Sequence, residues 1–435
     1  MRAITSRALL ALTFAAGLNA AAPAFAADAP APAASAASAA NSVSPAFAKP
    51  FNEAQDLLKA GNGPASLAKL KEVEALPNLS PYEKYLILRV RAPAEYTASD
   101  NTAAVADFEA LLANDQLPAS DRLQIMKALA TILYTTEQYP KATVAIQRYL
   151  DAGGDDAQLR ELLPQTQYVN KDYATAAKGF RVQIDATYAA GKVPTEKTLR
   201  LLATSSSQSD NDAGYLWALE HLAVDYPKPD YWKELVARAA HTDKFSERMY
   251  VDNYRLKTQA LGGVSDSERL TYAALAAHAG YPEEAKRILD DAYASRPFTG
   301  ADLAEANKLR ADVNKAVASD RAQQAAAESS ARTAKDGNAL VSLGLLETVD
   351  GNPQQGAQLI EQGIAKGGIR NPEEARLHLG FALVKAGRDA DAVKTLDSVT
   401  SGPNGIVPIA HVWSLYAQSR LHAAAAPAQA AAASK

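Results

Sequence analysis

The side chains that most often hold metals or transfer protons are few in this sequence and far apart. Six histidines are spread along the chain, no two of them lie four residues apart, and no His-Glu-x-x-His pattern occurs. A zinc site on one helix needs that spacing, because residues four apart share a face. We expect His378, directly before Leu379-Gly380, to lie in a seam between helices. The sequence therefore predicts no metal site.

A polar run in mid-chain, Asp210-Asn211-Asp212, resembles the start of a calcium-binding loop. Such a loop has glycine at its sixth position and glutamate at its twelfth. Here Gly214 stands one place early, and the twelfth position is His221. We interpret the run as a polar turn between two helices.

Motifs for covalent or cofactor chemistry are missing as well. The chain has no cysteine, and it contains no Gly-x-Ser-x-Gly, phosphate-binding loop or dinucleotide fingerprint. The glycines of 344–356 and 363–368 fall at positions typical of turns and helix contacts. We expect a protein that is not an enzyme and holds no cofactor. A serine or carboxylate site assembled in space stays open, because it leaves no pattern in the sequence.

The charge balance is mild and argues against several partners. Lysine and arginine total 45 against 49 acidic residues, a net charge of −4, and loss of Arg2 and Arg7 with the N-terminal segment would make it −6. No run of five like charges occurs. Nucleic-acid binding needs a concentrated basic face, and docking on a membrane surface needs a polybasic segment. We therefore expect no nucleic-acid partner and no membrane insertion.

The first residues have the pattern of a cleaved signal peptide, which we assign to residues 1–26. Arg2 and Arg7 precede the apolar stretch 8–18, and Ala24-Phe25-Ala26 fits a cleavage site. The apolar stretch is shorter than the ~20 residues of a membrane span. Without cysteine the mature chain has no lipid anchor and no disulfide. We expect an exported, soluble protein.

Two segments lack the large apolar side chains that offset the entropy of ordering. Residues 27–46 are mostly alanine, proline and serine, and residues 422–435 are mostly alanine with proline and glutamine. We predict that the first is a disordered linker and the second a disordered tail.

A repeated spacing fills the chain between these ends: a small residue, a loop, an alanine, then apolar residues four and seven places later. The best copy runs from Leu379-Gly380 to Leu396 and Val399. It predicts two antiparallel helices that meet at small residues, and one pair buries its apolar face only by stacking on the next. The expected class is all-α, an α-solenoid. The residues expected to pack these pairs are Ala130, Ala142, Ala176, Phe180, Ala285, Leu343, Gly344, Leu379, Gly380, Ala392 and Leu396.

With copies about 34 residues apart, residues 47–421 resemble the tetratricopeptide repeat (TPR) family. Pro164 and Gln167 depart from its pattern, so we expect a distorted repeat there. With the run 225–232 in mid-chain, the layout is similar to uncharacterised periplasmic TPR proteins of proteobacteria. The resemblance implies a solenoid, a periplasmic location, and an extended peptide or a partner's helix bound on the concave face of the first helices.

We expect two arrays, over residues 47–300 and 337–421. Residues 301–336 contain a stretch with alanine as nearly its only apolar residue, which predicts a helical linker or a hinge. An ordinary long repeat helix is the alternative. Residues 406–421 predict a helix that caps the last repeat.

The aromatic side chains Tyr226, Tyr231 and Trp232 surround two prolines that fix an extended turn. They either pack this turn onto the helices or line an exposed groove. Tyrosine and tryptophan anchor interfaces when partly buried, so these three are the candidate partner-binding residues.

The leading hypothesis is a non-catalytic scaffold that binds protein or peptide as an accessory of an envelope complex. One alternative is an enzyme or regulatory subunit acting on envelope polymer, which carboxylates gathered between the two arrays would favour. The other is a structural spacer.

Overall fold

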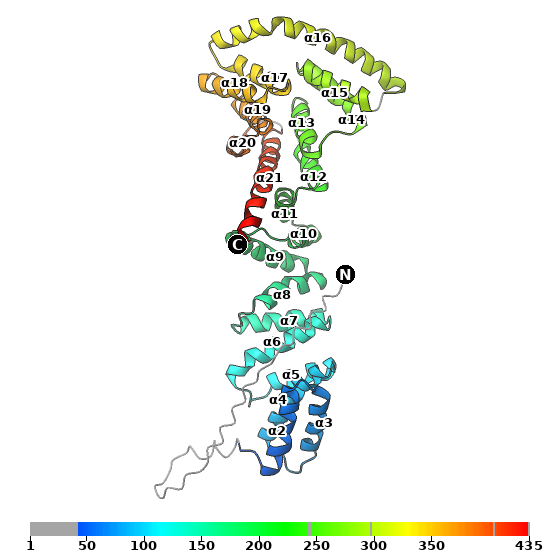
Figure 1. Ribbon diagram of the computed structural model, residues 1–435, viewed down its shortest axis with the longest axis vertical. Helices are drawn as coiled ribbons and strands as arrows, with labels where there is room; N and C mark the ends of the chain where they lie inside the picture. The colour runs from blue at the N-terminus through cyan, green and yellow to red at the C-terminus, as the bar shows by residue number, and fades with distance from the viewer. Residues whose placement is uncertain (1–41, 242–244, 296–297, 403–404, 434–435) are drawn as a thin grey trace. The chain divides into compact units, whose positions relative to one another are not determined.

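The computed structural model describes residues 42–241, 245–295, 298–402 and 405–433 (Figure 1). Within these residues the chain forms helices and turns and no strand. The all-α class predicted from the sequence is therefore confirmed. The predicted signal peptide and the linker up to residue 41 lie outside the described residues.

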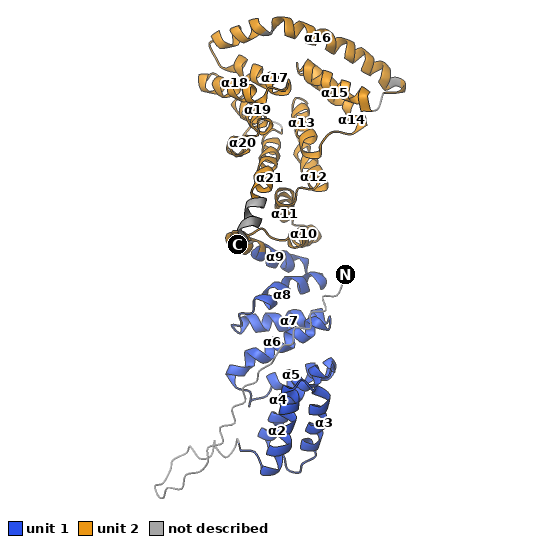
Figure 2. Ribbon diagram, in the orientation of Figure 1, with its two compact units in different colours: residues 1–183 blue, residues 184–435 orange. Residues whose placement is uncertain are grey.

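The chain divides into two compact units, residues 1–183 and 184–435 (Figure 2). In unit 1 consecutive helices pack as antiparallel pairs. The pairs are α2 (Pro45–Lys59) with α3 (Gly63–Glu74), α4 (Pro81–Thr97) with α5 (Asn101–Leu112), α6 (Ala119–Thr135) with α7 (Tyr139–Asp151), and α8 (Ala157–Val169) with α9 (Tyr173–Ala189), whose last residues belong to unit 2.

One turn geometry closes the first helix of each pair. After α2, the N–H of Gly61 donates to the carbonyl of Leu58 and the N–H of Asn62 to that of Leu57, with Gly61 at φ 75°. This arrangement satisfies carbonyls at the helix end that would otherwise lack partners. The left-handed residue recurs every 34 to 39 residues in the first part of the chain, at Gly61, Ser99, Glu137, Lys171 and Asp210.

The predicted distortion at Pro164 is accommodated by its neighbour in space. Pro164 is buried inside α8, and a Cβ on Gly179 of α9 would lie only 2.8 Å from the Cβ of Pro164. Glycine therefore makes room for the proline ring, and α8 still pairs with α9.

Unit 2 contains α10 to α21, again with consecutive helices in contact. Its helices are α10 (Glu196–Gln208), α11 (Asp212–Asp225), α12 (Pro229–Ala240), α13 (Met249–Leu261), α14 (Asp266–His278), α15 (Pro282–Ser295), α16 (Gly300–Thr333), α17 (Asn338–Val349), α18 (Pro353–Lys366), α19 (Pro372–Lys385), α20 (Asp389–Asp397) and α21 (Ile406–Ala433).

Glycines set the closest helix contacts of unit 2. A Cβ on Gly344 of α17 would lie 2.6 Å from the carbonyl oxygen of Gly356 in α18, and one on Gly380 of α19 would lie 2.3 Å from the side chain of Leu396 in α20. Side chains larger than hydrogen would push these helices apart. The two helix pairs therefore depend on glycine at Gly344 and Gly380.

Residues 301–336 are the expected helical linker or hinge, for which a long repeat helix is the alternative. These residues form most of α16, which packs against α14, α15 and α17. The compact units separate instead at residues 183 and 184, so both sides of α16 belong to unit 2. The segments before and after α16 are joined by long-range contacts, for which the sequence contains no pattern.

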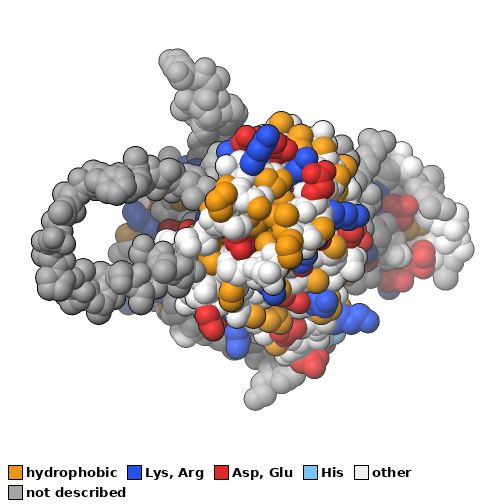
Figure 3. All heavy atoms as spheres, turned by 90° about the horizontal axis from the view of Figure 1, so that it is seen from below, with side chains coloured by type: hydrophobic (Ala, Val, Ile, Leu, Met, Phe, Trp, Pro, Cys, Tyr) orange, Lys and Arg blue, Asp and Glu red, His pale blue; other side chains and the backbone are white. Residues whose placement is uncertain are grey.

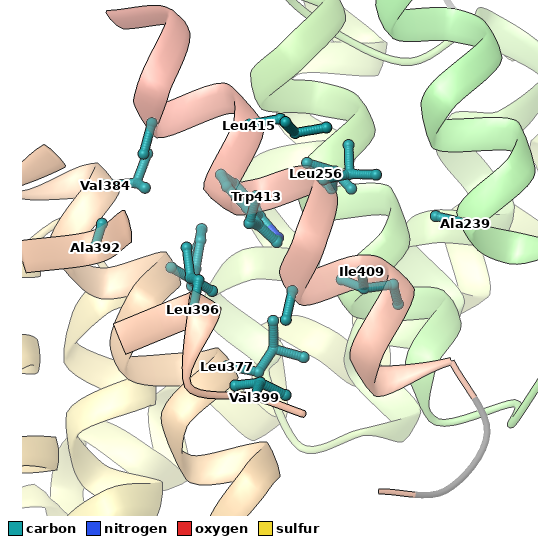
Figure 4. Packing of buried hydrophobic residues seen from close by; sticks show 14 of the residues in the cluster. Ala239, Leu256, Leu377, Val384, Ala392, Leu396, Val399, Ile409, Trp413 and Leu415 are labelled. Carbon is teal, nitrogen blue, oxygen red and sulfur yellow. The ribbon is translucent and has the colours of Figure 1, made fainter. Parts of the chain in front are cut away.

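The last helix makes the largest of these contacts. Besides α19 and α20, α21 packs on α11, α12 and α13, so it does more than cap the last repeat (Figure 4). Figure 4 shows Trp413 between Leu396 on one side and Leu256 of α13 on the other, with Leu415 next to Leu256. Residues 422–433 continue α21, in contrast to the disordered tail we predicted. Alanine is the best helix former, and here it extends a helix that is already nucleated.

A buried ion network also joins distant helices of unit 2. Arg255 of α13 pairs with Asp252 at 2.8 Å and with Glu284 of α15 at 2.7 Å, and Asp252 faces His378 of α19 at 3.3 Å. The hydroxyl of Tyr272 donates to Glu284. Burial alone would raise the pKa of Asp252, but His378 and Arg255 lower that pKa to about 2. As expected, His378 lies at a seam between helices.

Candidate peptide-binding groove

An apolar groove of about 460 Å³ runs between two second helices of unit 1, α5 and α7, over the first helix α6. The floor consists of Met126, Leu129 and Leu133 of α6, with Leu112 and Ala145 beside them. The remaining lining residues, at the edges, are Glu109, Pro140, Lys141, Val144 and Arg148.

The pattern of α7 explains why an apolar side chain faces this groove. Ala142, Ile146 and Tyr149 are buried at helical spacing and hold α7 on the core. Val144 is out of phase with them and is 68% exposed, beside exposed Pro140. A second apolar stripe therefore remains open to solvent, and a partner can cover it.

Charged side chains border the groove asymmetrically. Lys141 and Arg148 stand on the α7 edge and Glu109 on the α5 edge, and all three are exposed. Among the described residues, none of the three forms an ion pair. These charges are therefore available to a bound molecule.

The first helices of unit 1 use their charges differently. Arg89 of α4 pairs with Asp121 of α6 at 2.6 Å, and Lys127 of α6 pairs with Asp156, the cap of α8, at 2.5 Å. These charges form ion pairs between neighbouring repeats, in contrast to the charges beside the groove. The apolar groove thus runs between two second helices with a first helix as its floor, whereas the resemblance implies a site on the concave face of the first helices.

The three aromatic candidates are held by the protein itself. Trp232 is 2% exposed and meets the ring of Tyr416 edge-on at 5.6 Å. The hydroxyls of Tyr226 and Tyr231 donate to the carbonyl of Pro194 and to Glu196. For Trp232 the observed packing corresponds to the first of the two alternatives, because α21 covers the side chain. Tyr226 and Tyr231 are half-buried and serve to fix the turn.

The residues predicted to pack the repeats lie inside the molecule. Ala142 and Ala392 are fully buried, each in a second helix. All the others are also buried: Ala130, Ala176, Phe180, Ala285, Leu343, Gly344, Leu379, Gly380 and Leu396.

A second cavity, of about 320 Å³, lies in unit 2 at the N-termini of α13 and α19. Most of its charges are paired, since Arg248 pairs with Glu374 and Glu373 with Arg376, and Arg370 is the lining cation for which the described residues provide no ion pair. It therefore offers a ligand less uncompensated charge than the groove of unit 1.

Carboxylates gather in unit 2 around Asp350, at the end of α17. Burial, followed by the nearby carboxylates of Glu283 and Glu347, raises the pKa of Asp350 to about 6 against the lowering effect of Arg287. The Oδ1 atom of Asp350 is buried without a hydrogen-bond partner among the described residues. A carboxyl group that titrates near neutral pH is a feature of acid–base sites.

Other classes of site find no support in the described part of the chain. No group of three or more histidine, aspartate or glutamate side chains there could hold a metal ion. None of the helices described is both long and apolar enough to cross a membrane. The face drawn in Figure 3 carries acidic and basic side chains mixed with hydrophobic ones, without a basic patch.

Sequence reasoning missed the groove residues Lys141, Val144 and Arg148. The available signal was an apolar residue out of phase with Ala142 and Ile146 in an otherwise amphipathic helix. The basic side chains gave no signal, because exposed lysine and arginine occur on most helices.

The pairing of helices within the chain makes it a TPR-like α-solenoid. No protein-family model and no curated protein matches it. Similar solved structures include a tetratricopeptide repeat protein from Parabacteroides merdae, at 12% identity over 69% of this chain and 98% of that one, with a TM-score of 0.26. Yeast Tom70 matches at 11% identity over 89% and 99%, with a TM-score of 0.24. The TPR domain of P58(IPK) matches at 11% identity over 86% and 99%, with a TM-score of 0.22.

These scores are too low to support an argument about function. The assignment to a TPR-like fold therefore depends on the helix pairs, the recurring left-handed turn and the small residues at helix contacts.

Proposed function

We propose that this protein is an exported, non-catalytic scaffold that binds a peptide segment of a partner protein in the groove between α5 and α7. The observation that carries the proposal is Val144, a mostly exposed apolar side chain above an apolar floor. The groove follows α7 for about two turns, from Pro140 to Arg148, which suits a short segment of chain. Apolar side chains in such a groove supply most of the binding energy.

A phage-displayed library of random twelve-residue peptides tests this site. Selection on the purified mature chain should enrich peptides whose binding is lost in Val144→Asp. The matched control is Val182→Asp, because Val182 of α9 is 69% exposed in the same unit and does not line the groove. If Val144→Asp binds every selected peptide as tightly as the control does, the groove is not the site.

Export to the periplasm, as an accessory of an envelope complex, is the second part of the proposal. It is supported by the arginines, the apolar stretch and Ala24-Phe25-Ala26 of the first 26 residues. Cells that express the full chain should release it on osmotic shock, and its N-terminal sequence should begin near Ala27. A protein retained in the cytoplasm with its first residues intact would contradict export.

An enzyme or regulatory subunit acting on envelope polymer is the alternative that one observation favours, the raised pKa of Asp350 among carboxylates. Purified cell-wall polymer incubated with the protein would then release soluble fragments, and Asp350→Asn would abolish the release. If wild type and variant both leave the polymer intact, the scaffold remains the better proposal.

A further inference from the structure

We propose that the segment bound between α5 and α7 is amphipathic and acidic, with two carboxylates about 10 Å apart along its α7 side. This inference depends on the proposed function, that the groove binds a peptide. It adds the chemistry of the partner, which the apolar floor alone does not specify.

The α7 edge of the groove is basic at both ends. Lys141 and Arg148 are seven residues apart on one helix, which separates them by about 10 Å along the axis. Both are exposed, and within the described chain neither has an acidic partner. A bound segment with carboxylates at this separation would complete two ion pairs at once.

The apolar part of the segment has a defined place between these charges. Val144 stands halfway between Lys141 and Arg148 in sequence, above Leu129 and Leu133 of the floor. Apolar side chains bound against Val144 would remove water from its exposed surface and from the adjacent charges. Partial removal of water strengthens an ion pair at the rim of an apolar contact.

The opposite edge gives the segment an orientation. Glu109 of α5 is exposed, lines the groove and has no ion pair among the described residues. A segment with its acidic flank along α5 would place carboxylates beside Glu109 and leave Lys141 and Arg148 without partners. A lysine or arginine on the flank that faces Glu109 would favour the opposite, productive orientation.

The spacing can be met in two backbone conformations. In a helix such carboxylates are seven residues apart, whereas in an extended chain only residues an even number apart share a face, and the nearest matches are two or four residues, about 7 or 13 Å. The distance between the acidic positions of the selected peptides therefore reports the conformation of the bound segment.

The experiment uses the peptides that depend on Val144 in the selection above. Their sequences should share apolar residues flanked by two acidic ones. The Lys141→Glu/Arg148→Glu variant should bind these peptides at least tenfold more weakly, and raising the salt from 50 to 500 mM should weaken binding to wild type alone. Synthetic copies with lysine at the acidic positions should prefer the charge-reversed variant.

Lys49→Glu/Lys71→Glu is the matched control, because these lysines are exposed in α2 and α3 of the same unit and do not line the groove. Its affinities should equal those of wild type. Peptides that require Val144 but carry no acidic residues, or that bind the Lys141→Glu/Arg148→Glu variant unchanged, would overturn this inference and leave the proposed function standing. Recovery of no peptide that depends on Val144 would overturn both.

Discussion

In unit 1 each helix contacts mainly its neighbours one or two places along the chain, whereas in unit 2 the last helix returns to pack on α11, α12 and α13. The open arrangement leaves second-helix surfaces such as Val144 uncovered. The returning helix of unit 2 covers the equivalent kind of surface, and Trp232 is buried beneath it. The comparison teaches that the same helix pairs leave an apolar groove uncovered when the array stays open and form a core when it closes on itself.

The two units also differ in how they hold charge. Arg91 of unit 1 bonds to Glu74 and Asp107 with about a third of its side chain exposed. Arg255 of unit 2 bonds to Asp252 and Glu284 with 3% exposed. Water can replace the partners of Arg91 but not those of Arg255, so the closed unit depends on its ion network and the open unit does not.

The largest test of the comparison is Trp413→Ala, which removes the main buried side chain of α21. Trp413 is 1% exposed and contacts the rings of Phe381 and Tyr416. We expect a loss of about 3–5 kcal/mol in unit 2. Native-state hydrogen exchange should show weaker protection in α11–α13 as well as in α19 and α20, because α21 joins them.

Phe108→Ala in unit 1 is the matched variant, since Phe108 of α5 is fully buried. Its cost should be similar, but the loss of protection should stay within α4 to α7, because an open array transmits damage only to neighbouring repeats. If the effect of Trp413→Ala stays equally local, unit 2 is not held closed by α21.

The second test is Arg255→Met, which leaves Asp252 and Glu284 buried without their cation. We expect a loss of about 3 kcal/mol or more in urea unfolding of unit 2. Arg91→Met, the unit 1 counterpart, should cost about 1 kcal/mol or less, because its partners are partly hydrated. Equal losses at the two sites would contradict the contrast between buried and hydrated ion pairs.

The third test compares how the stability of each unit depends on pH. Burial raises the pKa of Asp350 in unit 2 to about 6 from an ordinary 3.8, so the folded state disfavours its charged form. The stability contributed by protonated Asp350 is present at pH 4 and is lost as the pH rises through about 6. Asp350→Asn should therefore raise the melting temperature of unit 2 at pH 8 and change little at pH 4.

In unit 1 burial, and then Asp107, raise the pKa of Glu95 to about 7. By the same reasoning, Glu95→Gln should stabilise unit 1 at pH 8. The pH at which this stabilisation appears should be about one unit higher than for Asp350→Asn. Melting curves from pH 4 to pH 8 measure both windows. A gain in either variant that is as large at pH 4 as at pH 8 would show that repacking, not ionisation, is responsible.

The sequence predicted the helix pairs because their signals are local. Small residues at Gly380 and Ala392 and apolar residues at helical spacing follow from how two adjacent helices pack. The pairing of Asp252 with His378 and the return of α21 onto α13 join segments more than 120 residues apart. Nothing local in the chain distinguishes a charge that will be buried in such a contact from one that stays in water.

Part of the groove was missed for a related reason. Alanine, isoleucine and tyrosine of α7 defined its buried face, and Val144 was simply an apolar residue outside that pattern. Exposed apolar residues are common on folded proteins. Only the neighbouring α5 and α6 turn this one into the wall of a groove.

The left-handed turns show the same limit within a single repeat. Gly61 and Gly387 mark two of them in the sequence, but Ser99, Glu137 and Lys171 hold the same conformation without glycine. Local propensity argues against these residues at positive φ. The hydrogen bonds that close the helix end, together with packing of the second helix, impose the conformation.

The smallest expected effect tests this last point. Glu137, between α6 and α7, has φ 59°, and Glu137→Gly should stabilise unit 1 by about 0.5–1 kcal/mol because glycine adopts that conformation without a Cβ clash. Thr136→Gly is the control, since Thr136 has φ −93° and its hydroxyl bonds to the carbonyl of Ile132, so that change should destabilise.

Gly387→Ala, at φ 76° in unit 2, should cost as much as Glu137→Gly gains. Urea unfolding measures all three, and a loss of stability in Glu137→Gly would mean that contacts of the Glu137 side chain outweigh the backbone strain. Opposite signs for Glu137→Gly and Gly387→Ala would instead establish that the open and the closed unit share one repeat geometry and differ only in what covers it.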